Sequence, residues 1–218
     1  MVKTLIFDVD GTLLDTERIY VQSWLDAGEA RGYAIPMEIL RFTRGRRREE
    51  SKACFQKHFG ADFPYEAMLQ ERVRLSEQRI AAMTPEALRM PHALELLGFL
   101  KDRGYRLAAA TSTVREKTLS HLAHARLLEY FDAIVCGDMV TRGKPEPDIF
   151  LKAAELTDTP PDACLVVGDT PADVLAAAAA GMPMVLIPDQ VQADARSVAL
   201  CWKCLENLRQ LQSLLESE

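Results

Sequence analysis

The chain has 218 residues, of which 48% are hydrophobic and 27% are charged, and its formal net charge is −6. This length suits one large domain or a core domain with a smaller insert, and the composition is ordinary for a globular protein. The acidic balance excludes a global basic surface for nucleic acid. No apolar run is long enough to span a membrane and no apolar leader precedes the first strand, so we expect a cytoplasmic protein without nucleic-acid or membrane partners.

The first predicted element is a short buried strand, Leu5-Ile6-Phe7, followed by Asp8-Val9-Asp10-Gly11-Thr12. Two carboxylates two positions apart point to the same face of a continuing strand, and Gly11 lets the chain turn sharply. Acids at the end of a buried strand require a compensating cation. The same residues also fit a hairpin turn with Leu13-Leu14 as its return strand, and by themselves they do not decide between the two.

A helical block follows, from about Thr16 to Met83, without a strand pattern. Tyr20, Trp24 and Ala27 recur at helical spacing. Pro36 and Pro64 are expected to open helices. We predict a bundle of about four helices.

From Pro91 onward, helices and strands alternate. We expect buried strands at 106–110, 133–136, 163–167, 184–187 and 198–201, separated by helices, with an amphipathic helix at the C-terminus. Such alternation predicts an α/β fold, a Rossmann-like parallel sheet with helices on both faces. Residues 1–15 and 86–218 would form this core, and residues 16–85 an inserted α-helical cap.

Ligands of such sheets bind beyond the carboxyl ends of the strands. Polar groups follow the predicted strands there: Thr111-Ser112-Thr113, then Lys144-Pro145, then Gly168-Asp169 with Asp173 four residues later. Taken singly, each could be a helix cap, a loop or a turn. Together with Asp8 and Asp10 they supply the acids, hydroxyl and ammonium that phosphoryl transfer requires, and oxygen ligands of this kind suit Mg²⁺.

These motifs resemble the four motifs of the haloacid dehalogenase-like hydrolases, over essentially the whole chain. The helical insert is similar to the small α-helical cap of the subfamily that contains phosphoglycolate phosphatase and β-phosphoglucomutase. The resemblance implies an Mg²⁺-dependent phosphatase that acts on a small phosphorylated metabolite, with sugar phosphates as the expected class.

The resemblance also implies roles for individual residues. Asp8 would be the nucleophile that forms an aspartyl-phosphate, and Asp10 the general acid and base. Thr111 would hold the phosphate, and Lys144 would neutralise Asp8 and the phosphoryl group. Metal ligands would come from Asp8, Asp10 (through its carbonyl), Asp169 and Asp173. Substrate-binding positions would be Gly11, Thr12, Ser112 and, in the cap, Arg48.

The cap is expected to select the substrate. Gly45-Arg46-Arg47-Arg48 resembles a Gly-x-x-Arg cap loop, and Arg48 could grip a hydroxyl, a carboxylate or a second phosphate. The alternative is a solvated helix start with Arg44, Arg46 and Arg47 near Glu49 and Glu50. Tyr20 stands where several relatives, including the mutase, carry a His, which favours hydrolysis over a mutase reaction. The alternatives left open are a β-phosphoglucomutase-like enzyme and a non-catalytic sensor of a phosphorylated ligand.

The five cysteines do not form a disulfide pattern, because their number is odd and their spacing is scattered. Cys201-Trp202-Lys203-Cys204 is a lone C-x-x-C without a second ligand pair, so we assign it neither zinc nor redox chemistry. We expect a monomer or a weak homodimer.

Overall fold

The structure is a computed structural model that describes residues 2–44, 48–190 and 194–216. It consists of two compact units, one formed by Met1–Asp15 and Thr84–Glu218 and the other by Thr16–Met83. None of the described helices combines the length and the apolar character that crossing a bilayer requires.

The first unit is built on a six-stranded parallel sheet with the strand order β3-β2-β1-β4-β5-β6. The strands are β1 (Thr4–Phe7), β2 (Arg106–Ala110), β3 (Ala133–Val135), β4 (Cys164–Gly168), β5 (Met184–Leu186) and β6 (Lys203–Cys204). The helices of this unit are α5 (Pro85–Leu88), α6 (Ala93–Asp102), α7 (Arg115–His124), α8 (Asp148–Leu156), α9 (Pro171–Ala179), α10 (Ala195–Leu200) and α11 (Leu208–Glu216).

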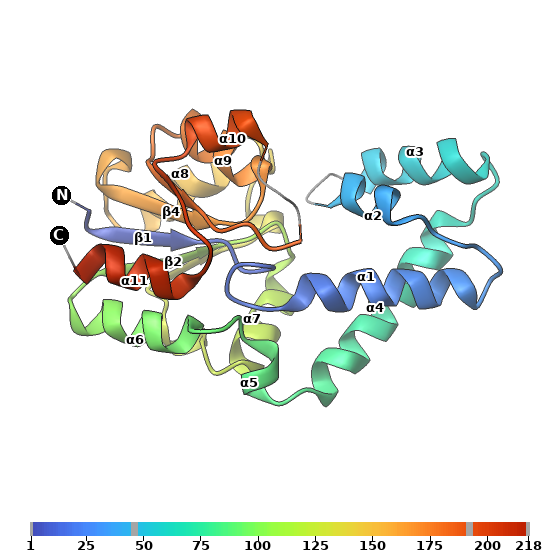
Figure 1. Cartoon of the computed structure of the whole chain (residues 1–218), viewed down its shortest axis with the longest axis horizontal. Helices are drawn as coiled ribbons and strands as arrows, with labels where there is room; N and C mark the ends of the chain where they lie inside the picture. The colour runs from blue at the N-terminus through green and yellow to red at the C-terminus, as the bar shows by residue number, and fades with distance from the viewer. Residues whose placement is uncertain (1, 45–47, 191–193, 217–218) are drawn as a thin grey trace. The chain divides into compact units, whose positions relative to one another are not determined.

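Helices cover both faces of this sheet. Figure 1 shows α8, α9 and α10 on one side of the strands and α6 and α11 on the other. Strand β1 lies at the centre, between β2 and β4, and all four of its residues are buried. A strand with both faces covered requires a continuous apolar run rather than alternation, as Leu5-Ile6-Phe7 provides. The predicted α/β sheet is therefore confirmed.

The C-terminal part of the sheet corrects one prediction. Residues 198–201, expected to be a strand, lie in and just after helix α10, and the sixth strand is the short β6 that follows. Asp194 caps α10 by accepting a hydrogen bond from the Ser197 N–H at 2.7 Å. Because Val198 and Leu200 are both exposed, their apolar character does not mark a buried strand.

The second unit contains four helices among the described residues: α1 (Thr16–Glu29), α2 (Met37–Thr43), α3 (Arg48–Phe59) and α4 (Tyr65–Ala82). Pro36 and Pro64 stand at the N-caps of α2 and α4, as predicted. The unit has its own aromatic core, in which Phe55 is fully buried and stacks against Trp24 at a ring-centroid distance of 4.8 Å.

Candidate active site

The first motif leaves the carboxyl end of β1 through a tight turn. Asp8 continues the sheet pairing for one residue, because its N–H donates to the Val167 carbonyl at 2.8 Å. Gly11 has a φ of 85°, in the left-handed region that favours glycine. The N–H groups of Leu13 and Leu14 both donate to the Val9 carbonyl, and helix α1 begins at Thr16. The hairpin alternative is therefore wrong, since Leu13 and Leu14 close a turn.

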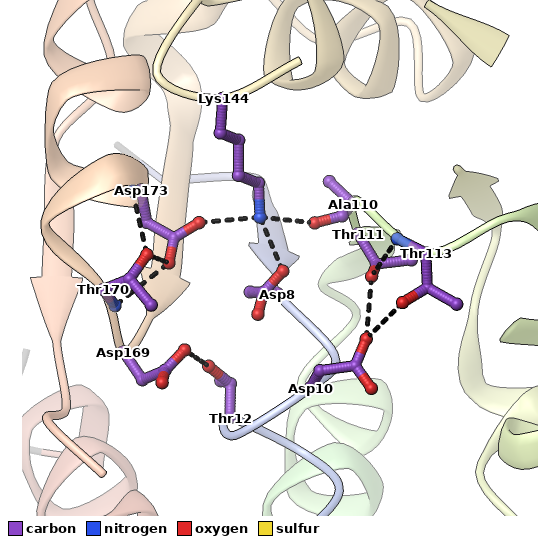
Figure 2. Close-up of polar contacts among 10 residues, drawn as sticks. All are labelled: Asp8, Asp10, Thr12, Ala110, Thr111, Thr113, Lys144, Asp169, Thr170 and Asp173. Carbon is purple, nitrogen blue, oxygen red and sulfur yellow. Dashed lines mark hydrogen bonds and ion pairs between the residues drawn. The ribbon is translucent and has the colours of Figure 1, made fainter. Parts of the chain in front are cut away.

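Lys144 lies at the centre of the site and is 7% exposed. Its Nζ donates to Asp8 Oδ1 at 2.5 Å and to the Ala110 carbonyl at 2.9 Å, and it lies 2.6 Å from Asp173 Oδ1 (Figure 2). Asp8, just after β1, Ala110 of β2 and Asp173 of α9 thus meet at one ammonium group. An unpaired ammonium would be strongly disfavoured at this burial, so these three partners account for its position.

Burial and the neighbouring charges together set the ionisation of Asp8 and Lys144. It raises the pKa of Asp8 to about 7, against the attraction of Lys144 and with the help of the Asp173 and Asp10 carboxylates. Burial lowers the pKa of Lys144, but the carboxylates of Asp173 and Asp8 outweigh this effect, so its pKa lies above the ordinary value. The lysine is therefore charged at neutral pH, while Asp8 needs a further cation to be fully ionised there.

Three buried acids form a cluster that fits a metal ion. Asp8, Asp169 and Asp173 each offer a carboxylate oxygen within 4.8 Å of the others. Three carboxylates face one ammonium group, that of Lys144, so negative charge is in excess. A divalent cation would offset this excess. All the donors are oxygen atoms, which is the set that Mg²⁺ prefers. The residues present thus fit the metal that the family resemblance implies.

The acid Asp173 is fixed by its own helix start. Thr170 Oγ1 donates to Asp173 Oδ2 at 2.5 Å, and the Thr170 N–H donates to the same oxygen at 3.1 Å. The Asp173 N–H in turn donates to Thr170 Oγ1, so the pair forms a capping box at α9. Gly168 permits this close approach, since a Cβ there would lie 2.9 Å from Asp173 Cγ.

The carboxyl group of Asp10 points toward the two threonines that follow β2. Its Oδ2 accepts hydrogen bonds from Thr111 Oγ1 at 3.1 Å and from Thr113 Oγ1 at 2.8 Å (Figure 2). Asp10 is not part of the cluster formed by the carboxylates of Asp8, Asp169 and Asp173, which suits the expectation that only its backbone carbonyl faces a metal. Its side chain is thus bonded to residues that follow β2.

The remaining motif residues lie around this centre. Thr12 is buried, and its hydroxyl donates to Asp169 Oδ1 at 3.3 Å. Ser112 is exposed between Thr111 and Thr113. The structure therefore brings Asp8, Lys144, Asp169 and Asp173 into mutual contact or close range, with Asp10 and Thr111 paired beside them.

Two arginines of the second unit, Arg44 and Arg48, pair with glutamates of the same unit. Arg48 begins α3, is exposed and pairs with Glu66 of α4. Gly45, Arg46 and Arg47 lie outside the described residues. Arg44, expected near the glutamates that follow, is instead largely buried, with its Nε 3.1 Å from Glu17 Oε2 of α1.

The ring of Tyr20 makes a cation–π contact within the same unit. The guanidinium of Arg72 lies over it, 3.9 Å from the ring centroid. The role of Arg48 toward a substrate stays a prediction.

Sequence reasoning gave no role to two residues of the site, Thr113 and Thr170. Thr170-Pro171-Ala172-Asp173 carries the pattern of a capping box with proline at the first helical position, so Thr170 could have been found. Thr113 had no such signal, because its bond to Asp10 joins positions 103 residues apart. The two thiols of the C-x-x-C motif are free, with Cys201 half-buried and Cys204 exposed.

Comparison with known proteins places the chain in a family. The model of the haloacid dehalogenase-like hydrolases matches residues 2–181. A phosphorylated carbohydrates phosphatase from Thermotoga maritima is 30% identical over 180 residues, which cover 83% of this chain and 82% of that protein. A probable pseudouridine-5'-phosphatase from Drosophila melanogaster is 35% identical over 190 residues, which cover 84% and 80%.

A solved structure shares the fold of this chain. The crystal structure of a putative β-phosphoglucomutase from Thermotoga maritima has a TM-score of 0.79 and 26% identity, and the match covers 99% of both chains. The family match and the named relatives confirm the enzyme class predicted from the motifs, a phosphoric monoester hydrolase. The chain belongs to the haloacid dehalogenase-like hydrolases.

Proposed function

We propose that this hydrolase removes phosphate from a small phosphorylated carbohydrate, or from a related phosphomonoester, through an aspartyl-phosphate on Asp8 with the help of Mg²⁺. The observation that carries the proposal is the buried Lys144, which joins Asp8 to Asp173 beside Asp169, while Asp10 is held separately by hydroxyl groups. The names of two relatives, which refer to phosphorylated carbohydrates and to pseudouridine 5'-phosphate, support the substrate class.

In the first step, a carboxylate oxygen of Asp8 attacks phosphorus and the bond from phosphorus to the ester oxygen breaks. Asp10 gives its proton to the leaving oxygen, so that an alcohol departs. Lys144 favours the ionised form of Asp8, which a bound cation would complete, and offsets the charge of the phosphoryl oxygens. The Thr111 hydroxyl and the Ser112 N–H would hold these oxygens, since both follow β2 at the same edge of the sheet.

In the second step, a water oxygen attacks the phosphorus of the aspartyl-phosphate and the bond to Asp8 breaks. Asp10 takes one proton from this water, which restores its starting form, and inorganic phosphate leaves. One ester and one water are thus converted into one alcohol and one phosphate.

Asp8 and Asp169 would hold the metal, supported by Asp173 and the Asp10 carbonyl. When bound, Mg²⁺ would supply positive charge against the phosphoryl oxygens. The excess of buried carboxylates over Lys144 supports this assignment.

The test is a phosphate-release panel with purified protein and Mg²⁺. The panel contains sugar phosphates, pseudouridine 5'-phosphate, phosphoglycolate and nucleotides, and kcat/KM is compared across it. We expect turnover of at least one phosphorylated sugar or nucleoside, dependence on Mg²⁺, and complete loss in Asp8→Asn. The proposal fails if the wild type releases no phosphate from any member of the panel.

The same panel separates the alternatives. A mutase would convert one sugar phosphate into its isomer faster than it releases phosphate, so sugar products are followed together with phosphate. A sensor would bind a member of the panel without turnover, and Asp8→Asn would bind it as the wild type does.

A further inference from the structure

Two hydroxyl groups converge on one oxygen of Asp10. Thr113 Oγ1 donates to Asp10 Oδ2 at 2.8 Å and Thr111 Oγ1 donates to it at 3.1 Å (Figure 2). Both threonines follow β2, and Asp10 follows β1, the neighbouring strand. The carboxyl group that the proposed function uses for proton transfer is therefore held from the adjacent strand end, most closely by Thr113.

The hydroxyl groups of Thr111 and Thr113 cannot both donate to Asp10 while one of them donates to the phosphate. A hydroxyl group has one proton and donates it to one acceptor at a time. If Thr111 donates to a phosphate oxygen, as the proposed function requires, it no longer donates to Asp10. The Thr113 hydroxyl can still donate to the acid at that stage.

The backbone of Thr113 supports this division. Its N–H donates to Thr111 Oγ1 at 3.1 Å, which occupies a lone pair of that hydroxyl and limits the directions in which its proton can point. Thr113 thus orients Thr111 through its main chain and Asp10 through its side chain.

The segment that carries these threonines is itself fixed. Gly137 packs so closely that a Cβ there would lie 2.2 Å from the Ser112 carbonyl oxygen, and its N–H donates to the Thr113 carbonyl at 3.0 Å. The Arg115 N–H donates to Asp138 Oδ1 at 3.1 Å. The turn after β3 therefore clamps the turn after β2, which sets the position of the Thr113 hydroxyl.

We propose that Thr113 is the positioning residue for Asp10: its hydroxyl holds the Asp10 carboxyl in the orientation for proton transfer and leaves the Thr111 hydroxyl to the phosphate. This inference rests on the proposed function. Thr113 itself passes no proton. Its contribution is to the steps in which Asp10 donates to the leaving oxygen and accepts from water.

The test compares Thr113→Val, which keeps the shape and removes the hydroxyl, with Thr113→Ser, which keeps the hydroxyl. We expect Thr113→Val to lower kcat about 10- to 100-fold on an alkyl phosphate, the effect of one hydrogen bond to a charged group, with KM changed less than about twofold. Thr113→Ser should stay within about threefold of the wild type. Thermal unfolding of both variants controls for folding.

An aryl phosphate gives a second readout. The nitrophenolate of p-nitrophenyl phosphate leaves without a proton, so Thr113→Val should release one equivalent in a burst and then turn over slowly. In an Asp10→Asn background, Thr113→Val should change neither the burst rate nor the slow rate further, because the group it positions is already absent.

Three results would overturn the inference: an equal effect of Thr113→Val with and without Asp10, a rise of KM that accounts for the whole loss, or a Thr113→Ser variant as poor as Thr113→Val. If the wild type itself releases no phosphate, the proposed function fails and this inference with it. If the wild type is active and Thr113→Val matches it, only the inference fails.

Discussion

Asp8 is buried beside Lys144 and near three further acids, and this environment decides its protonation. Burial raises the pKa of Asp8 more than Lys144 lowers it, so this pKa rises from 3.8 to about 7. A buried carboxylate at this position therefore keeps its proton over a wide range of pH when no divalent cation is bound.

We predict that this shift makes the metal-free protein less stable as pH rises. Between about pH 4 and pH 7 the folded state binds more protons at Asp8 than the unfolded state does, so the free energy of unfolding falls through this window. The slope from one such group is at most about 1.4 kcal/mol per pH unit. Urea unfolding in the presence of a chelator, at several pH values, measures it.

Asp8→Asn is the matched variant for this measurement, since it keeps the shape and removes the titration. Its free energy of unfolding should fall less steeply than that of the wild type between pH 4 and pH 7, and the two slopes should agree above pH 7. Equal slopes throughout would show that Asp8 titrates near its ordinary value.

At the scale of elements, the site depends on contacts between turns at neighbouring strand ends. The turn that begins at Gly137, just after β3, packs on the backbone of Ser112, just after β2, with no room for a side chain. Thr111 and Thr113 flank Ser112. The position of their hydroxyl groups is therefore set by Gly137, although glycine has no side chain.

We predict that Gly137→Ala forces this turn to move. The added Cβ would lie 2.2 Å from the Ser112 carbonyl oxygen, and overpacking of this kind costs about 1–3 kcal/mol. We expect a lower thermal midpoint and a lower kcat, measured by calorimetry and by phosphate release.

Gly98→Ala is the control, since Gly98 lies inside helix α6 with nothing within 4 Å of the added Cβ. It should stabilise the protein by about 0.5–1 kcal/mol and leave kcat unchanged, because alanine favours a helix interior over glycine. If Gly137→Ala behaved like this control, the clamp between the two turns would be disproved.

At the scale of the whole molecule, the chain forms two units, each with its own core. The core of the first lies around the parallel sheet, and Phe150 is one of its fully buried side chains. The core of the second is aromatic and centres on Phe55. The two tryptophans of the chain are divided between the units, with Trp24 in the second and Trp202 in the first.

We predict that a cavity in one core destabilises chiefly its own unit. Phe55→Ala should cost about 3–5 kcal/mol and lower the urea midpoint reported by Trp24, measured by fluorescence in a Trp202→Phe background. Phe150→Ala is the matched change in the other core and should lower the midpoint reported by Trp202 in a Trp24→Phe background. Equal shifts of both reporters for either change would show that the units unfold together.

Local patterns in the sequence determined much of this protein. The apolar run before Asp8 and the alternation of strands and helices after Pro91 predicted the parallel sheet, because burial on both faces dictates continuous apolar strands. The acids, hydroxyls and lysine at the strand ends identified the family, since their chemistry and their order along the chain are visible without coordinates. The assignment of catalytic roles stays a prediction.

Other features were decided by the tertiary structure alone. The sequence does not reveal that Thr113 bonds Asp10, that Arg44 pairs with Glu17, or that residues 195–200 form a helix with exposed apolar side chains. Periodicity reports on which face of an element is buried, and it carries no information about distances between side chains far apart in the chain. Those distances set hydrogen bonds and pKa values, so only the fold could show that Lys144 also pairs with Asp173 and that Asp10 is held by Thr113.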